Sequence, residues 1–172
     1  MRVLTVKQPW AWAIIYGGKD VENRVRNIAG DYRGPVAIHA GIQTDVDAAH
    51  DPRILAAWKA AADTGTLPKH RIEGKLRHQS IYLEYSAIIG VVDLTDAHHA
   101  NEPFSGCETE VDLNGEGATM IDLCSPWAEP DVYHLVLANP RPLSVPMEWK
   151  GALGIRHLPD EIPAMVMELQ RG

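Results

Sequence analysis

Short stretches rich in Val, Ile and Leu recur along this chain and predict a series of β-strands. Such segments run from Arg2 to Val6, from Val36 to Ala40 and from Val132 to Leu137, and branched apolar residues favour strands. Ala87 to Leu94 is apolar throughout, as expected of a strand that is buried on both faces. We expect Asn139-Pro140 to end the last of these strands, because proline cannot donate a ladder hydrogen bond.

Three other segments have the pattern of helices. Pro9 suits the first turn of a helix that runs to Tyr16. Asp51-Pro52 combines an N-cap with a proline at the first helical position, and the alanine-rich run that follows should continue until Thr64-Gly65. In the tail after Asp160, apolar residues recur at helical spacing.

Two polar segments lack a regular apolar pattern. Residues 66–80 form the most basic window of the chain and are expected to be an exposed loop or arm. Residues 97–118 carry Gly, Asn, Asp and Glu without periodicity, which predicts a loop insertion. Several short strands with two or three helices predict an α+β fold, a small mixed β-barrel with flanking helices.

A charged segment joins the first helix to the next strand. The pair Gly17-Gly18 permits the left-handed backbone that ends a helix, and Val21–Arg24 can then begin a strand. Side chains alternate across a strand, so Glu22 and Arg24 should share one face. Lys19 should be an exposed lysine that Glu22 keeps protonated. The three charges would then line one cleft that suits a phosphate and a base edge; the alternative is a surface salt-bridge cluster of little energetic value.

The end of the first strand and the first helix supply further candidates for this cleft. Lys7 and Gln8 lie close in sequence to the helix and are expected to contribute to binding. Trp10 and Trp12 are two positions apart, so they point about 200° away from each other on a helix. One of them should pack while the other is exposed or lines a pocket. We take Trp10 as a candidate stacking surface for a base, although partial exposure is also ordinary for tryptophan.

The charge balance narrows the range of partners. The chain has 16 Lys and Arg against 23 Asp and Glu, a net charge of −7. Because non-specific binding to nucleic acid grows with the number of neutralised phosphates, broad coating of RNA or DNA is disfavoured. Binding of one nucleotide or of a short single strand in a local basic pocket is still compatible with this charge. Within the basic window, we expect four side chains to contribute: Lys69, Arg71, Lys75 and Arg77.

Composition also bears on compartment and size. The 172 residues contain two cysteines, too few for a secreted disulfide framework, and no signal peptide is evident. No apolar run approaches the roughly 18 residues that a membrane-spanning helix needs. We therefore expect a soluble cytoplasmic protein without a membrane partner, folded as a single domain. Its oligomeric state stays open.

Two features of the sequence suggest catalytic motifs, and neither has the full pattern. Gly17-Gly18-Lys19 is not a Walker motif, because Ala13 stands where a glycine is needed and Asp20 follows the lysine. Ser125 is a potential nucleophile, but no Gly-x-Ser-x-Gly surrounds it. A turn set by Pro126 is the alternative, and Ser125 is kept as a candidate cleft residue because loops after buried strands often supply site groups.

Seven histidine and cysteine side chains are potential metal ligands. None has zinc-finger or His-Glu-x-x-His spacing, so we predict neither a metal site nor a cofactor. His39, in an apolar strand, is expected to be a hydrogen-bonded core histidine. The seven are His39, His98, His99, Cys107, Cys124, His134 and His157.

The charged segment has the pattern Gly-x-Lys-x-x-Glu-x-Arg at residues 17–24. This pattern resembles the signature of the ASCH (activating-signal-cointegrator homology) family, which has a PUA-like fold and is associated with RNA. Residues 4–11 resemble the opening strand and helix of that family. Residues 32–40 resemble its next hairpin, and residues 133–137 and 151–155 resemble its closing strands.

The resemblance covers residues 3–40 and 86–156 of a single ASCH/PUA-like domain over residues 1–172. Less family-like insertions lie near 41–80 and 97–125. The family implies an RNA-related role with RNA or a modified nucleoside as partner, and it leaves open whether the protein is an enzyme.

Three functional hypotheses follow from the resemblance. In a metal-independent ribonuclease, Lys19 would stabilise charge on the phosphate while Glu22 or a nearby histidine moves protons. A branch of small ASCH proteins hydrolyses N4-acetylcytidine with Lys, Thr and Glu. Lys19 matches that lysine, but Glu22 stands where the threonine would be, and Asp93 is the nearest candidate for the glutamate. In a binding module, Lys19 and Arg24 would position a backbone while an aromatic ring stacks on a base.

Overall fold

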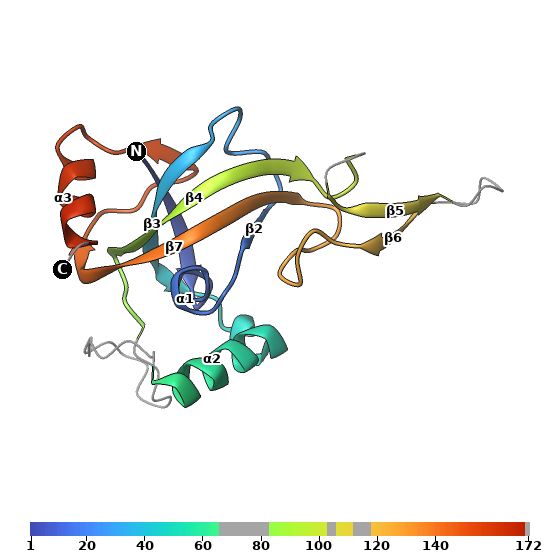
Figure 1. Ribbon diagram of the computed structural model, residues 1–172, viewed down its shortest axis with the longest axis horizontal. Coiled ribbons are helices and arrows are strands. Elements are labelled where there is room, and N and C mark those ends of the chain that lie inside the picture. The colour runs from blue at the N-terminus through green and yellow to red at the C-terminus, as the bar shows by residue number, and fades with distance from the viewer. Residues whose placement is uncertain (66–82, 103–105, 112–117, 171–172) are drawn as a thin grey trace.

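A six-stranded mixed sheet forms the centre of the computed structural model, which describes residues 1–65, 83–102, 106–111 and 118–170 (Figure 1). Strands β1 and β3 are parallel and all other neighbours in this sheet are antiparallel. The order is β2-β7-β4-β3-β1-β8, and β5 and β6 form a separate two-stranded ribbon. The strands are β1 (Arg2–Gln8), β2 (Val21–Arg24), β3 (Gly34–Thr44), β4 (Ala87–His99), β5 (Glu108–Val111), β6 (Ala118–Asp122), β7 (Tyr133–Glu148) and β8 (Ile155–His157).

Three α-helices flank this sheet in the described part of the chain. Helix α1 packs against β1, β3, β4 and β7 and contacts α2, whereas α3 packs against β7 at the far end of the sheet (Figure 1). The capping residues that predicted α2 cap it in the structure. The Asp51 side chain accepts from the Arg53 backbone N–H at 2.8 Å, and Gly65 ends the helix in the left-handed conformation. The helices are α1 (Trp10–Tyr16), α2 (Pro52–Thr64) and α3 (Ile162–Leu169). The α+β class with flanking helices is confirmed.

Strand β4 is buried on both faces, as its continuous apolar run predicts. Ile89 and Leu94 pack in the cluster that contains α1, whereas Ile88 and Val91 pack in the cluster that contains Val166 of α3. The strand therefore joins two hydrophobic cores. Its burial fixes its register, because a slip of one residue would exchange the two faces.

Two opposite edges of the sheet approach each other, which gives it a barrel-like curvature. β8 pairs with β1 only over Arg2, Val3 and Leu4. From Thr5 onward, that edge of β1 has no strand partner among the described residues. The Arg24 side chain at the end of β2 donates to the Thr5 carbonyl at 3.1 Å and joins the two edges. The space beside this contact is the cleft described below.

Two boundaries differ from the sequence prediction. Strand β7 continues through Asn139-Pro140, where a break was expected, and Pro142 again pairs with Gly90. The register shifts at this point and Asn139 has a φ of 51°. The strand therefore tolerates the proline at an irregularity of the ladder. In the segment 151–155, only Ile155 is in a strand, and the residues before it form a loop.

The segment 97–118 is not the plain loop that its composition predicted. Strand β4 continues to His99, and β5 pairs with β6 in an antiparallel ribbon that extends away from the sheet (Figure 1). The sequence of this ribbon is rich in polar residues, so no pattern of apolar residues predicted its strands. The window 66–80 lies outside the described residues. No helix in the described ranges is long and apolar enough to cross a membrane.

The two cores predict a position-specific effect of truncation in β3. Ile38 is 0% exposed, whereas Ile42 of the same strand is 80% exposed. We expect Ile38→Ala to lower the free energy of unfolding by about 2–5 kcal/mol. Ile42→Ala, the matched control, should change it by less than about 0.5 kcal/mol. Urea denaturation followed by circular dichroism measures both, and equal losses would contradict this description of the core.

Candidate functional site

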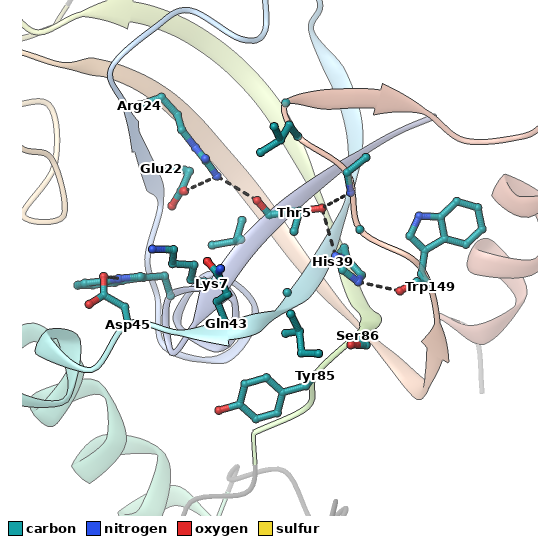
Figure 2. A pocket seen from close by; sticks show the side chains of 18 of the residues that line it. Thr5, Lys7, Glu22, Arg24, His39, Gln43, Asp45, Tyr85, Ser86 and Trp149 are labelled. Carbon is teal, nitrogen blue, oxygen red and sulfur yellow. Dashed lines mark hydrogen bonds and ion pairs between the residues drawn. The ribbon is translucent and has the colours of Figure 1, made fainter. Parts of the chain in front are cut away.

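A cleft of about 1300 Å³ opens where the two sheet edges meet (Figure 2). One wall is the edge of β2, and the other is formed by β1, the end of β3 and residues 148–154. The side chains of Arg24, Thr5 and His39 line it in succession (Figure 2). The cleft is thus built from segments that are far apart in the sequence.

Lys19 lines this cleft, although only 3% of its side chain is exposed. Its Nζ donates to the Val21 carbonyl and lies 3.6 Å from Glu22 Oε2. Nζ also lies 5.5 Å from the ring centroid of Trp10 and 5.8 Å from that of Trp127, within cation–π range. The expectation of an exposed lysine is therefore wrong, because Trp10 of the preceding helix and the distant Trp127 both pack beside it.

Burial decides the electrostatics of Lys19. Loss of water around the ammonium lowers the pKa of Lys19 below its ordinary range, and the Glu22 carboxylate only partly opposes this effect. The positive charge of Arg53 lowers the pKa further. Glu22 favours the protonated form of Lys19, as expected, but burial has the larger effect on the pKa. Removal of a proton from Lys19 is easier than from a lysine in water.

Glu22 and Arg24 share one face of β2, as the strand alternation predicted. Arg24 Nη2 lies 2.9 Å from Glu22 Oε1, and the same nitrogen donates to the Thr5 carbonyl. Glu22 therefore sits between two cations, Lys19 and Arg24. The structure brings these three predicted residues together.

The two tryptophans of α1 divide as predicted. Trp12 is 2% exposed and packs edge-on against Trp58, with ring centroids 5.5 Å apart. Trp10 lines the cleft, and its Nε1 donates to Asp45 Oδ2 at 3.0 Å. The Asp45 contact fixes the orientation of this indole ring. Lys7 is exposed and also lines the cleft.

Two predicted site residues are structural. Gln8 is 0% exposed; its Nε2 donates to the Glu84 carbonyl at 2.6 Å, and its Oε1 accepts from the Trp12 backbone N–H at 3.0 Å. Ser125 is buried, donates to the Asp20 carboxylate and accepts from a backbone N–H. Neither lines the cleft. Gln8 satisfies buried backbone groups of two segments and Ser125 orders a turn, so the structure places neither of these predicted site residues in the cleft.

His39 lies in the cleft wall with both ring nitrogens occupied. Its Nε2 lies 2.9 Å from the Trp149 carbonyl, which can only accept, so Nε2 carries the proton. Its Nδ1 lies 3.2 Å from Thr5 Oγ1 and accepts from that hydroxyl. The expected hydrogen-bonded histidine is confirmed, and it ties the loop after β7 to β1 and β3.

The charges around the cleft are balanced. Four cationic side chains and four carboxylates line it, apart from His39. Such a lining suits a small polar ligand with one or two charges rather than a long polyanion. The eight are Lys7, Lys19, Arg24, Lys150, Glu22, Asp45, Glu129 and Glu148. The four predicted binding residues of the basic window, Lys69, Arg71, Lys75 and Arg77, lie outside the described residues.

Sequence reasoning missed one wall of the cleft. Trp149, Gly151 and their neighbours line it, next to the Tyr85-Ser86 segment, whose Ser86 carbonyl accepts from the Trp149 backbone N–H at 2.9 Å (Figure 2). A Cβ at Gly151 would lie 2.6 Å from Cε1 of His39, so only glycine permits this close approach. The only sequence signal that could have indicated this wall is Trp149-Lys150-Gly151, which follows no strand pattern.

Of three comparisons with known proteins, only the comparison of structures gives matches. No protein-family model matches this chain, and no curated protein matches its sequence. The chain is similar to the crystal structure of ASCH from Zymomonas mobilis, with 14% identity, a TM-score of 0.45 and coverage of 98% of this chain and 94% of that chain. The chain is also similar to a tyrosine-to-phenylalanine mutant of that protein, with 15% identity, a TM-score of 0.48 and coverage of 98% of this chain and 96% of that chain. The structure neighbours are thus ASCH proteins.

The charge arrangement predicts unequal effects on stability. Glu22→Gln leaves two cations without their shared anion, one of them buried, so we expect it to lower the free energy of unfolding by about 3–5 kcal/mol. Lys19→Met leaves Glu22 paired with Arg24 and should cost about 1 kcal/mol or less. Urea denaturation measures both. Exposed Glu168→Gln is the control, and a larger loss for Lys19→Met would contradict this arrangement.

The His39 environment predicts a pH effect. Burial lowers the pKa of His39, and the contact with the Trp149 carbonyl only partly opposes this. A depressed pKa in the folded state gives stability that is complete above the unfolded value, about 6.5, and is lost as the pH falls through the folded value. We expect the melting temperature of His39→Gln to fall less than that of the wild type between pH 7.5 and 5. Parallel curves for the two proteins would refute a role for His39 in this loss.

Proposed function

We propose that the cleft binds RNA through a single nucleotide, with Lys19 as its central contact. The observation that carries this proposal is the buried ammonium between two indole rings in the cleft wall. An ammonium has three N–H donors. Val21 and Glu22 engage two of them in the described part of the chain. The third is available to a phosphate or carbonyl oxygen of a ligand.

Aromatic side chains support a base beside this donor. Trp10 is held in place by Asp45, and Tyr85 and Trp149 line the same cleft. A base stacked on one such ring gains about 1–3 kcal/mol without a requirement for a particular sequence. The volume of the cleft is ample for a nucleotide.

The balanced lining supports a local contact. With as many carboxylates as cations around the cleft, only a few phosphates of a strand would be neutralised. We therefore expect the logarithm of the RNA association constant to fall with the logarithm of salt concentration with a slope of about −1 to −2.

A ribonuclease mechanism receives less support from the geometry. His39 has both ring nitrogens engaged, and Glu22 lies between two cations. Neither is free to act as the base for a 2′-hydroxyl in this arrangement. RNA binding is therefore the role that we propose first.

Hydrolysis of an acyl amide on cytidine is the second candidate, and one observation favours it. The lowered pKa of Lys19 makes its amine better suited to exchange a proton near neutral pH. Asp93, the nearest candidate for a second acid, instead pairs with Arg141 at 2.6 Å and does not line the cleft. Carboxylates that line the cleft replace it as candidates, and among them Glu129 acts electrostatically on Lys19.

Fluorescence anisotropy with a labelled single-stranded RNA oligonucleotide tests the proposal. We expect Lys19→Met to weaken binding at least about tenfold, a loss of about 1.4 kcal/mol, and exposed Lys59→Met on α2 to leave it unchanged. Binding by Lys19→Met at wild-type strength would overturn the proposal. Incubation of the wild type with RNA and with N4-acetylcytidine in magnesium-free buffer then separates binding from either hydrolysis.

A further inference from the structure

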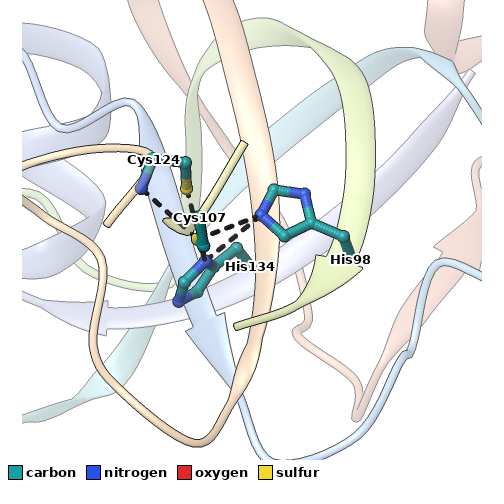
Figure 3. Close-up of side chains that lie close together, drawn as sticks. All are labelled: His98, Cys107, Cys124 and His134. Atoms are coloured by element: carbon teal, nitrogen blue, oxygen red, sulfur yellow. Dashed lines mark hydrogen bonds between the residues drawn. The ribbon is translucent and has the colours of Figure 1, made fainter. Parts of the chain in front are cut away.

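Four of the seven potential metal ligands meet at one point away from the cleft. The ligand atoms of His98, Cys107, Cys124 and His134 all lie within 4.8 Å of one another (Figure 3). None of the four lines the cleft. Both histidines and Cys107 are buried, and Cys124 is partly buried. The cluster is therefore a site distinct from the one described above.

Two nested antiparallel pairings assemble this cluster. His98 of β4 stands directly opposite His134 of β7 in the ladder. Cys107 precedes β5 and Cys124 follows β6, so the base of the β5–β6 ribbon brings the two thiols together. The order His, Cys, Cys, His along the chain reflects this nesting. Spacing rules for zinc fingers miss it because the ligand pairs come from strands, not from short loops.

Four of the six distances between the ligand atoms match a tetrahedral metal site. In a tetrahedron with metal–sulfur bonds of about 2.3 Å and metal–nitrogen bonds of about 2.0–2.1 Å, neighbouring ligand atoms stand about 3.3–3.8 Å apart. His134 Nδ1 lies 3.4 Å from Cys107 Sγ and 3.3 Å from Cys124 Sγ. His98 Nε2 lies 3.6 Å from Cys107 Sγ and 3.4 Å from His134 Nδ1.

Hydrogen bonds outside the cluster orient both imidazoles. His98 Nδ1 donates to Asp96 Oδ2 at 2.7 Å, and His134 Nε2 donates to the Glu129 carbonyl at 2.7 Å. In the neutral rings, the remaining nitrogens therefore carry lone pairs, and these face each other at 3.4 Å. Two facing lone pairs repel unless a proton or a cation lies between them, and the two thiols beside them can supply the proton or, as thiolates, ligate the cation. Carboxylate and carbonyl partners of this kind are typical of metal-ligating histidines.

We propose that His98, Cys107, Cys124 and His134 bind one zinc ion as a structural site. Two sulfur and two nitrogen ligands are a zinc donor set, and four protein ligands leave no position for substrate. The Cys124 backbone N–H, which lies 3.3 Å from Cys107 Sγ, would stabilise the bound thiolate. Binding releases the protons of the two thiols to solvent.

The proposed ion would hold one wall of the cleft in place. Residues 124–129 connect the cluster to the cleft, because the Glu129 carbonyl accepts from His134 while the Glu129 side chain lines the cleft. The Asn23 side chain of β2 donates to the Trp127 carbonyl and accepts from the Glu129 backbone N–H. Loss of zinc should therefore loosen this segment and the β5–β6 ribbon before the central sheet.

Metal analysis of the full chain tests the proposal. Protein purified under reducing conditions without chelator should contain about one zinc ion per chain. The Cys107→Ser/Cys124→Ser variant should contain almost none, whereas His157→Gln, a matched histidine change at an exposed site, should retain it. Because the double variant could fail to fold, wild-type protein is also stripped by a chelator and reloaded with cobalt. The visible bands of tetrahedral thiolate-bound cobalt are then expected.

Several results would overturn the proposal. The first is full zinc content in the double variant. The second is wild-type protein that contains no zinc although both of its thiols react after unfolding. The third is a disulfide between the two cysteines in protein that has never been exposed to oxidant. Stoichiometric iron would overturn the identity of the ion. These outcomes are independent of RNA binding.

The Asp96 contact offers a sharper test of geometry. Asp96→Asn should weaken zinc binding by about 10- to 100-fold, because it weakens the hydrogen bond that orients His98. Asp96 also pairs with Arg33 at 3.3 Å, so Arg33→Gln removes the other partner as a control and should leave zinc affinity unchanged. A competition titration with a chromogenic chelator measures both, and equal affinity of Asp96→Asn and the wild type would contradict the assigned ring orientation.

Discussion

The pairing of β4 with β7 is the constraint on which the other features depend. Apolar residues on both faces of β4 are buried in two cores, so the register of this ladder cannot slip without exposing one of them. At one end, the ladder places His98 opposite His134. At the other end, it places Ile88 opposite Met147, next to the segment that closes the cleft. One ladder thus positions both sites.

Burial of the Lys19 ammonium is costly. Transfer of an ammonium from water costs several kcal/mol even after relaxation, and an ion pair seldom recovers more than that. Here Glu22, a backbone carbonyl and two indole rings offset the cost. One of these rings, Trp127, belongs to the segment that the proposed zinc ion would anchor. The two sites are therefore mechanically connected, although each has its own chemistry.

Local physics explains which parts of the fold were predictable. The ends of α2 depend on Asp51 and Gly65, whose effects act within one helical turn. The burial of β4 depends on its own apolar content. By contrast, the continuation of β7 through Pro140 depends on a partner strand that offsets the missing donor. The β5–β6 ribbon has no apolar alternation, and only the pairing of its two strands defines it.

The sequence by itself determined that Glu22 and Arg24 share one face of a strand and that Trp10 and Trp12 point in different directions from one helix. Both of these follow from the geometry of a single helix or strand. Only the tertiary structure decided that Lys19 is buried, because one of the two rings beside it, Trp127, comes from a distant segment. It also decided that the four histidine and cysteine side chains meet. Such convergence depends on register between strands, and register is a property of the packed sheet that no single segment contains.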